Sequence, residues 1–462
     1  MYEPLEWWQT FADPVLNQVV EEALASNFDL AGAVSRVQQA RMRAGISKAA
    51  AFPLLQPAVS VNDFDGPTNA GIGAQLEEVG LDPSTLSAAG VDLPDRLGLT
   101  TYTLSVEFAY ELDFWGRNRN DARAAGAELV ATEADYLNAR MGVLAETVRT
   151  YLEIVSLRRQ QKLADEIANV LRQRETLAKS RYERGLIDLG GLHAARRSLR
   201  EAESELPQIE ALLADAEGRL WILMGGFRTD LAVMLSDSLT ASPSLDPVPT
   251  GIPADLVAQR PDILAAIQRV EAARYALGAR RADLLPRLSL HGSIGLQSTD
   301  SSEWFDPDQW FRNLTMNLIG PVFQGSRIQN NIALAEARLN EAAAAYGRSV
   351  VTAVNEVESA LVGLEATRRR HTLLTSLTEE TQAESDLQEY RYVSGVGNYE
   401  SFLTAEQTLL AAQSVLVAAE RDLGYARLAL HRALGGAWIA ADHKAFQRQQ
   451  PVRHLPSRPP TE

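Results

Sequence analysis

The chain has 462 residues and a formal net charge of −16, which argues against a nucleic-acid partner because such a partner needs a basic face. Apolar residues make up 46% of the chain, which excludes a disordered one, and the absence of cysteine excludes disulfides. The sequence contains no run of 18 apolar residues, so it predicts no transmembrane helix.

The first half of the chain, residues 1–235, is predicted to form short helices, two strands and two long helices. Strands are expected at about 57–65 and 99–114, where apolar and polar residues alternate and so lie on opposite faces of a sheet. Long helices are expected at about 116–183 and 188–224. The first contains no proline, and it would be roughly 100 Å long, which no compact globular domain accommodates.

Residues 236–440 form a second half that repeats the first, which indicates an internal duplication. The matching blocks are Asn27-Phe28-Asp29 with Arg260-Pro261-Asp262, Phe114-Trp115-Gly116 with Phe323-Gln324-Gly325, and the Tyr182–Gly185 block with the Tyr392–Gly395 block. Their spacing gives the first half about 24 extra residues, which we expect to form a surface loop between Asp63 and Leu99.

The second half predicts strands at about 287–299 and 309–321 and long helices at about 325–393 and 398–434, followed by a C-terminal tail at 441–462. Both return helices carry apolar residues seven apart, which is the coiled-coil period. These residues are Leu192, Leu199, Leu206, Leu213 and Leu220 in the first half, and Phe402, Leu409, Leu416, Leu423 and Leu430 in the second. An ordinary soluble coiled coil would show the same heptads.

The alternating strands fit either a soluble sheet or a membrane barrel. Their length of about 11 to 13 residues suits a tilted bilayer crossing, and aromatic residues stand near their ends, where a membrane barrel has its aromatic girdles. Four strands cannot close a barrel, and lipid does not tolerate an open edge. Three copies would supply 12 strands, whereas two would give an eight-stranded barrel with a filled interior.

The predicted fold is therefore mainly α, with a long α-helical coiled-coil barrel and four β-strands per protomer in a trimer. On the polar side of the strand at 99–114, Glu107, Glu111 and Asp113 are expected to face the barrel lumen, together with His291 from the second half. Nothing indicates an enzyme, a cofactor or a metal site, since the six histidines form neither an i, i+4 pair nor a cluster.

Several motifs resemble those of one family. The opening Trp7-Trp8-Gln9-Thr10-Phe11-Ala12-Asp13-Pro14, the block Gln259-Arg260-Pro261-Asp262-Ile263 and the Phe-x-Gly before each long helix are similar to the outer membrane factor family of TolC, OprM and NodT-like channels. The resemblance covers nearly the whole chain. It implies a homotrimer with its barrel in outer-membrane lipid and its helical tunnel in the periplasm.

The same resemblance implies a passive exit duct for drugs, small molecules or metal ions, docked to a periplasmic membrane-fusion adaptor and an inner-membrane transporter of the RND type. Many OprM- and NodT-like members carry an acylated N-terminal cysteine, whereas the sequence as given contains no cysteine and shows no export signal. Two alternatives stay open. One is the exit channel of type I protein secretion, and the other is a soluble coiled-coil scaffold or adhesin.

The turns between the long helices are the predicted sites. A glycine can take the left-handed position that ends the first helix, and Asp or Asn can cap the second. In the family these turns meet the adaptor. The residues concerned are Gly185, Leu186 and Asp188 in the first turn, and Gly395, Val396 and Asn398 in the second.

The family also implies a gate at the same turns. A family tyrosine that helps to close the entrance matches Tyr392, with Tyr182 as its repeat partner, and Arg391 and Arg181 stand beside them. The carboxylates that constrict the family's entrance fall on Ser401 and Thr404. Glu400 is adjacent, but helical geometry predicts that it faces another way, so we expect closure to rest on Tyr392, Arg391, Arg181 and apolar packing. In the alternative reading, both tyrosines only pack the ends of the coiled coil.

Overall fold

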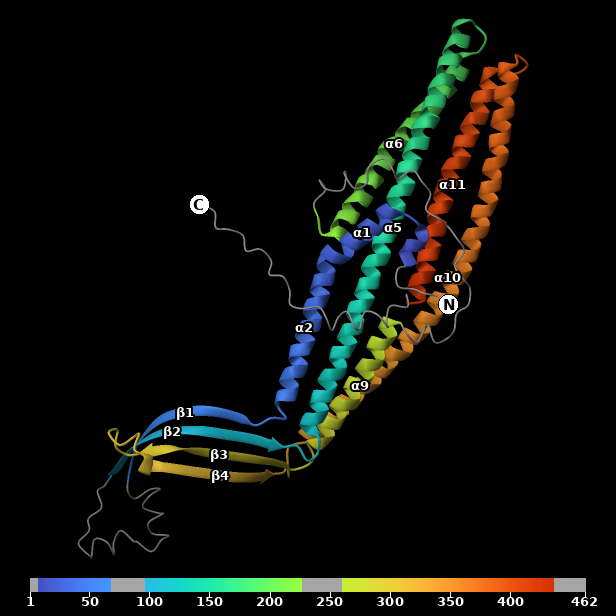
Figure 1. Cartoon of the computed structure of the whole chain (residues 1–462). Helices are drawn as coiled ribbons and strands as arrows, with labels where there is room; N and C mark the ends of the chain where they lie inside the picture. Colours follow the sequence, from blue (N-terminus) through green and yellow to red (C-terminus); the bar gives the residue numbers. More distant parts are fainter. Residues whose placement is uncertain (1–6, 68–95, 227–259, 436–462) are drawn as a thin grey trace, which may run out of the picture. The chain divides into compact units, whose positions relative to one another are not determined.

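The computed structural model describes residues 7–67, 96–226 and 260–435 (Figure 1). The predicted loop insertion, the boundary between the two halves and the C-terminal tail lie largely or wholly outside these ranges. The first half contains η1 (Trp7–Phe11), α1 (Pro14–Ser26), α2 (Phe28–Ala49), β1 (Leu54–Pro67), β2 (Arg96–Leu112), α5 (Arg117–Glu183) and α6 (Leu189–Met224). The second contains α9 (Pro261–Ala282), β3 (Arg287–Ser298), η2 (Pro307–Gln309), β4 (Trp310–Ile319), α10 (Arg327–Val393) and α11 (Tyr399–Ala433).

The predicted fold class is confirmed, because the described chain is mostly helical and contains one antiparallel sheet in the order β1-β2-β3-β4. The long helices match in pairs: α5 and α10 have 67 residues each, and α6 and α11 have 36 and 35. At about 1.5 Å per residue, α5 and α10 are each roughly 100 Å long. The two hairpins of the sheet repeat in the same way.

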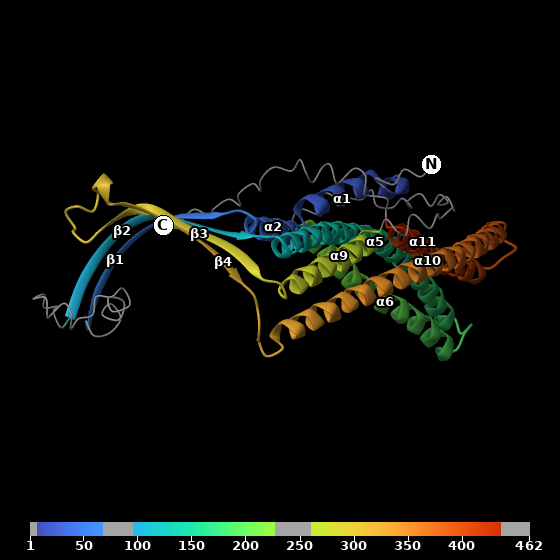
Figure 2. The same cartoon turned by 90° about the horizontal axis from the view of Figure 1, so that it is seen from below.

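Strands β1 and β2 extend further than their alternation predicts. Their ladder continues to Pro67 opposite Arg96, where Arg96 forms an ion pair with Asp65 at 3.1 Å and Thr100 donates a hydrogen bond to Asp63 at 2.6 Å. Glycine and proline near these ends suggested a loop, but the cross-strand polar bonds hold the hairpin together. Figure 2 shows that the paired strands curve along their length.

At its other end β2 stops earlier than predicted. The sequence predicts a strand to residue 114, but the strand ends at Leu112. Asp113 instead caps α5, accepting hydrogen bonds from the backbone N–H of Asn118 at 3.2 Å and of Arg119 at 2.8 Å. An acidic side chain is favourable at a helix N-terminus, where unpaired N–H groups point outward. Because Asp113 caps α5, it does not continue β2, and the alternation of the strand ends at Leu112.

The chain divides into two compact units, and each draws on both halves. Unit 1 comprises the described parts of residues 1–40, 128–270 and 341–462, and unit 2 comprises those of 41–127 and 271–340. Unit 2 contains the sheet. The largest apolar core of unit 1 joins the N-terminal segment to the middle of α5 and the end of α6, with Tyr151, Phe11, Leu16, Leu144 and Leu220 almost completely buried.

The duplication also places equivalent helix ends in contact within unit 1. Asn27 caps α2 and donates a hydrogen bond to the carbonyl of Leu223 at 2.9 Å, near the end of α6. Its repeat partner Arg260 donates to the carbonyl of Ala433 at 2.9 Å, at the end of α11, and is almost completely buried. Different side chains thus perform the same docking in the two halves.

By length and composition one described helix, α11, could cross a membrane, although the sequence has no unbroken run of 18 apolar residues. Its most apolar 18-residue window has a mean hydropathy of 1.3 and is 39% buried. The core helices of soluble proteins meet the same two criteria. Several apolar residues of α11 are buried in unit 1, among them Leu403, Leu409, Leu423 and Leu430.

Candidate functional site

The two tip turns, residues 185–188 and 395–398, have the same backbone geometry. Gly185 has φ +69°, its N–H bonds the Tyr182 carbonyl at 2.9 Å, and the N–H of Leu186 bonds the Arg181 carbonyl at 2.8 Å. This pair of bonds is the Schellman motif, which satisfies the last carbonyls of α5. Gly395, with φ +74°, ends α10 in the same way.

Each tip turn then starts its return helix with a capping side chain. Asp188 accepts a hydrogen bond from the N–H of Gly191 at 2.8 Å, and Asn398 accepts one from the N–H of Ser401 at 2.8 Å. Leu186 and Val396 stand exposed at the tips. The predicted tip residues therefore form two well-defined turns, each carrying one exposed apolar side chain.

The two helical hairpins are joined near their tips by polar contacts. Arg181 on α5 forms an ion pair with Glu400 on α11. Further along the same helices, Arg174 bonds Gln407 and Gln173 accepts a hydrogen bond from Tyr399. These contacts tie the first hairpin to the second within one chain, and Figure 1 shows α11 running beside α5.

Tyr392 lies against aromatic side chains of α11. Tyr392 contacts Tyr399, with 5.0 Å between ring centroids, and stacks on Phe402 at 6.3 Å. It therefore packs among aromatic rings from α11, which is the packing reading of this tyrosine. Its repeat partner Tyr182 is about as exposed.

Two hollows flank Glu400. One, of about 330 Å³, lies between α10 and α11 and is lined by the predicted entrance residues Ser401 and Thr404 together with Glu384 and Glu400. The other, of about 300 Å³, lies among α5, α6 and α11, and its lining includes Arg174, Arg181 and Glu400. Glu400 is thus shared by both hollows.

The sequence predicted that Glu400 faces away from the entrance residues, and it did not predict the ion pair of Glu400 with Arg181. The argument used the position of Glu400 on its own helix, whereas the contact depends on how α11 is rotated against α5. Carboxylates are therefore present beside Ser401 and Thr404, supplied by neighbouring positions. The sequence offered one signal, an arginine four residues before the first tip glycine and a glutamate five residues after the second.

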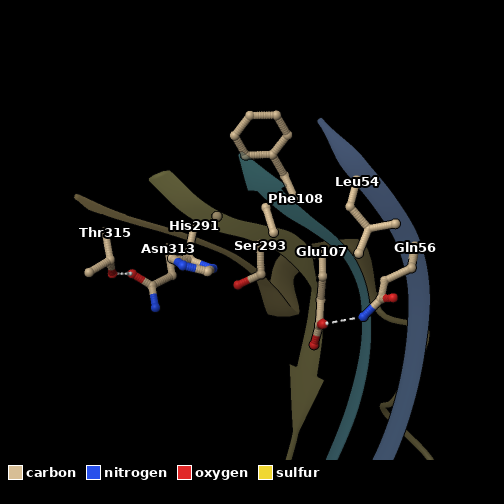
Figure 3. Close-up of a pocket in the computed structure, with 10 residues that line it drawn as sticks. Leu54, Gln56, Glu107, Phe108, His291, Ser293, Asn313 and Thr315 are labelled. Carbon is tan, nitrogen blue, oxygen red and sulfur yellow. Dashed lines mark hydrogen bonds between the residues drawn. The ribbon is translucent and has the colours of Figure 1, made fainter. Parts of the chain in front are cut away.

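A third hollow lies on the polar face of the sheet and is shown in Figure 3. Glu107 and Gln56 point toward each other there, and the Gln56 amide donates a hydrogen bond to the Glu107 carboxylate at 3.1 Å. The hollow has a volume of about 180 Å³, and its lining includes His291, Ser293 and Asn313. Within the described ranges, no cluster of three His, Cys, Asp or Glu side chains could hold a metal.

The other two acidic residues predicted on this face are engaged locally. Glu111 forms an ion pair with Arg117 at 2.9 Å, and Asp113 lies beyond the strand and caps α5. Glu107 and Glu111 therefore both lie on the polar face, and Glu107 bonds a neutral amide where Glu111 bonds a guanidinium.

The opposite face of the sheet is mainly apolar. Directly paired residues lie on the same face of a sheet, and the register brings Val59, Leu104 and Leu296 together, and likewise Leu55 and Phe108. Many of these side chains are exposed in a single chain, including Val106, Ile294, Leu314, Met316 and Leu318. A sheet with one polar and one apolar exposed face suits a barrel wall between water and lipid.

Comparison with known proteins agrees with this architecture. The Outer membrane efflux protein family matches residues 19–226 and 252–436. Outer membrane protein OprJ of Pseudomonas aeruginosa is 29% identical over 94% of the chain and 87% of its own length. Pyoverdine export outer membrane protein OpmQ of Pseudomonas putida is 28% identical over 94% and 88%.

A solved structure shows the same fold. The outer membrane protein VceC of Vibrio cholerae has a TM-score of 0.78 and 27% identity, covering 95% of this chain and 100% of its own. The family match includes both halves of the chain, with the tips and the sheet. The chain belongs to the outer membrane efflux protein family.

Proposed function

We propose that three copies of this chain close a 12-stranded barrel in the outer membrane and form a passive exit duct for small molecules. The observation that carries the proposal is the four-stranded sheet, whose β1 and β4 each have one unpaired edge within the described chain. Those edges need partners in lipid. Pairing β4 of one copy with β1 of the next supplies them, and three copies leave an open lumen.

Chemistry inside the duct is not required for export. The tips offer turns with exposed Leu186 and Val396, which suit apolar contacts with the hairpins of a periplasmic adaptor. An inner-membrane transporter, of the RND type, would supply the energy. One relative is named for pyoverdine export, which favours a small molecule over a secreted protein as the cargo.

The duct must be closed at rest, because a permanent pore would leak. The ion pair between Arg181 and Glu400 holds the two hairpins of a chain together near the tips. Both side chains are partly exposed, so removing the pair should cost under about 1 kcal/mol of folding free energy. If removing the ion pair changes the stability little but widens the opening greatly, the pair acts as a gate.

Single-channel conductance in planar bilayers tests this proposal. The wild-type trimer should conduct weakly, and the double variant Arg181→Ala with Glu400→Gln should conduct several-fold more because the hairpins separate. The swap Arg181→Glu with Glu400→Arg should restore the low conductance by rebuilding the pair. Trimer thermal stability should stay nearly constant throughout.

Two variants serve as controls. The ion pair between Arg197 and Glu201 lies on α6 alone, so Arg197→Ala with Glu201→Gln should leave conductance unchanged. Tyr392→Phe preserves the ring contacts and should also behave as wild type. If no variant conducts, the duct itself is refuted. If the control opens the channel as much as the test variant, the gate lies elsewhere.

A further inference from the structure

The apolar face of the sheet carries charged residues at two places: Asp63, Asp65 and Arg96 at the far end of the β1–β2 hairpin, and Arg312 on β4. Arg312 of β4 pairs with Ile294 of β3, which pairs with Val106 of β2. All three side chains therefore lie on the same face. Trp310 and Leu314 flank Arg312 on that face, two residues away on either side.

The position of Arg312 along β4 defines its depth. It lies seven residues from Ile319 and two from Trp310, the first residue of the strand. At about 3.3 Å per residue and a tilt of about 40°, Arg312 is roughly 18 Å from the Ile319 end of an apolar band that is about 25 Å tall. It therefore lies near the Trp310 boundary, where a charge costs little and a long side chain can extend to the headgroups.

The other arginines that end or flank the strands are neutralised by carboxylates. Arg96 pairs with Asp65, Arg117 with Glu111, and Arg287 with Asp283. Among residues 7–67, 96–226 and 260–435, no carboxylate forms an ion pair with Arg312, and its side chain is exposed. A cation on a lipid-facing surface needs an anion from another source.

We propose that Arg312 binds the phosphate of an anionic lipid in the outer leaflet, one lipid per chain. The planar guanidinium can donate two parallel hydrogen bonds to a phosphate. Trp310 stands at the same boundary, where indole rings lie among headgroups. The proposal rests on the proposed barrel, because only that arrangement turns the apolar face toward lipid.

Native mass spectrometry of the trimer extracted from outer membranes tests the site, with phosphorylated lipid A as the probe. The wild type should bind three molecules, and lipid A stripped of its phosphates should bind about tenfold more weakly. Arg312→Leu should bind phosphorylated lipid A about tenfold more weakly than the wild type does. Arg312→Lys, which keeps the charge and loses the fork, should fall between the two.

Arg287→Leu is the matched control. Arg287 begins β3, lies opposite Ile319 at the end of the sheet away from Trp310, and forms an ion pair with Asp283. It should bind lipid A as the wild type does. Equal binding by Arg312→Leu and wild type would overturn the proposal, and so would complete displacement of the lipid by inorganic phosphate. A wild-type chain absent from the outer-membrane fraction, or not trimeric in it, would instead refute the proposed barrel.

Discussion

His431 is buried in unit 1 near Arg427, whose guanidinium lies 5.1 Å from the centroid of the Phe11 ring. Burial first, and the charge of Arg427 second, lower the pKa of His431 from 6.5 to about 4. The unfolded chain therefore binds a proton on this side chain at a higher pH than the folded chain does. The stabilisation is complete above about pH 6.5 and is lost as the pH falls toward about 4.

From about pH 7 to about pH 5, the free energy of unfolding should decrease by about 2 kcal/mol per chain through His431 alone. Urea unfolding of the wild type and of His431→Leu at both pH values measures this contribution. The variant should lose that part of the pH dependence, whatever its absolute stability. An identical pH dependence in both proteins would show that His431 does not titrate in this way.

Single-residue roles were only partly predictable from the sequence. The tip glycines and their caps follow from local backbone rules, and the structure has them where the sequence places them. The partner of Arg181 does not follow, because the contact with Glu400 depends on the rotation of α11 against α5. Tyr392 shows the same limit, since its ring partners come from α11 and could not be read from its neighbours in sequence.

The strands of the sheet allow a test of which face meets lipid. Leu314 of β4 lies five residues from Ile319, near the middle of the apolar face, so Leu314→Arg should cost about 2–4 kcal/mol in a bilayer. Thr103→Arg places the same charge on the polar face and should be tolerated. Trimer yield in outer membranes and resistance of the trimer to heat in detergent measure both variants. Equal damage at the two positions would contradict the assigned faces.

Thr103 is a better polar-face control than its neighbour Ser105. Ser105 alternates onto the polar face in the sequence, but only 6% of it is exposed. Gly295 lies directly opposite, and the Cα of Ser105 would be 2.6 Å from any Cβ added there. Alternation alone does not predict this close approach of two backbones.

Element types were largely predictable, and element ends less so. The two-residue alternation of a strand and the seven-residue repeat of a coiled-coil helix each lie within one element. They therefore predicted the strands and the long helices. The end of β2 depends on Asp113 capping the next helix, and the far end of β1 depends on Asp65 pairing with Arg96. Such side-chain contacts with other segments decide where a strand stops.

At the scale of the whole molecule, the duplication and the need to close a barrel gave the architecture. Matching motifs in the two halves predicted matching hairpins, and the structure contains helices of nearly equal length in each. The transported molecule is not predictable in this way, because the patterns of the tips and strands describe backbone geometry and the faces of a sheet. A duct needs only an open path of suitable charge.

The central claim is that three chains close one barrel, and the mass of the particle extracted from outer membranes in mild detergent tests it most directly. Native mass spectrometry should give three times the chain mass of 50.5 kDa, with no stable smaller species. Four strands per chain then make 12, and neither edge of a sheet is exposed to lipid. A stable monomer or dimer as the native species would contradict the account.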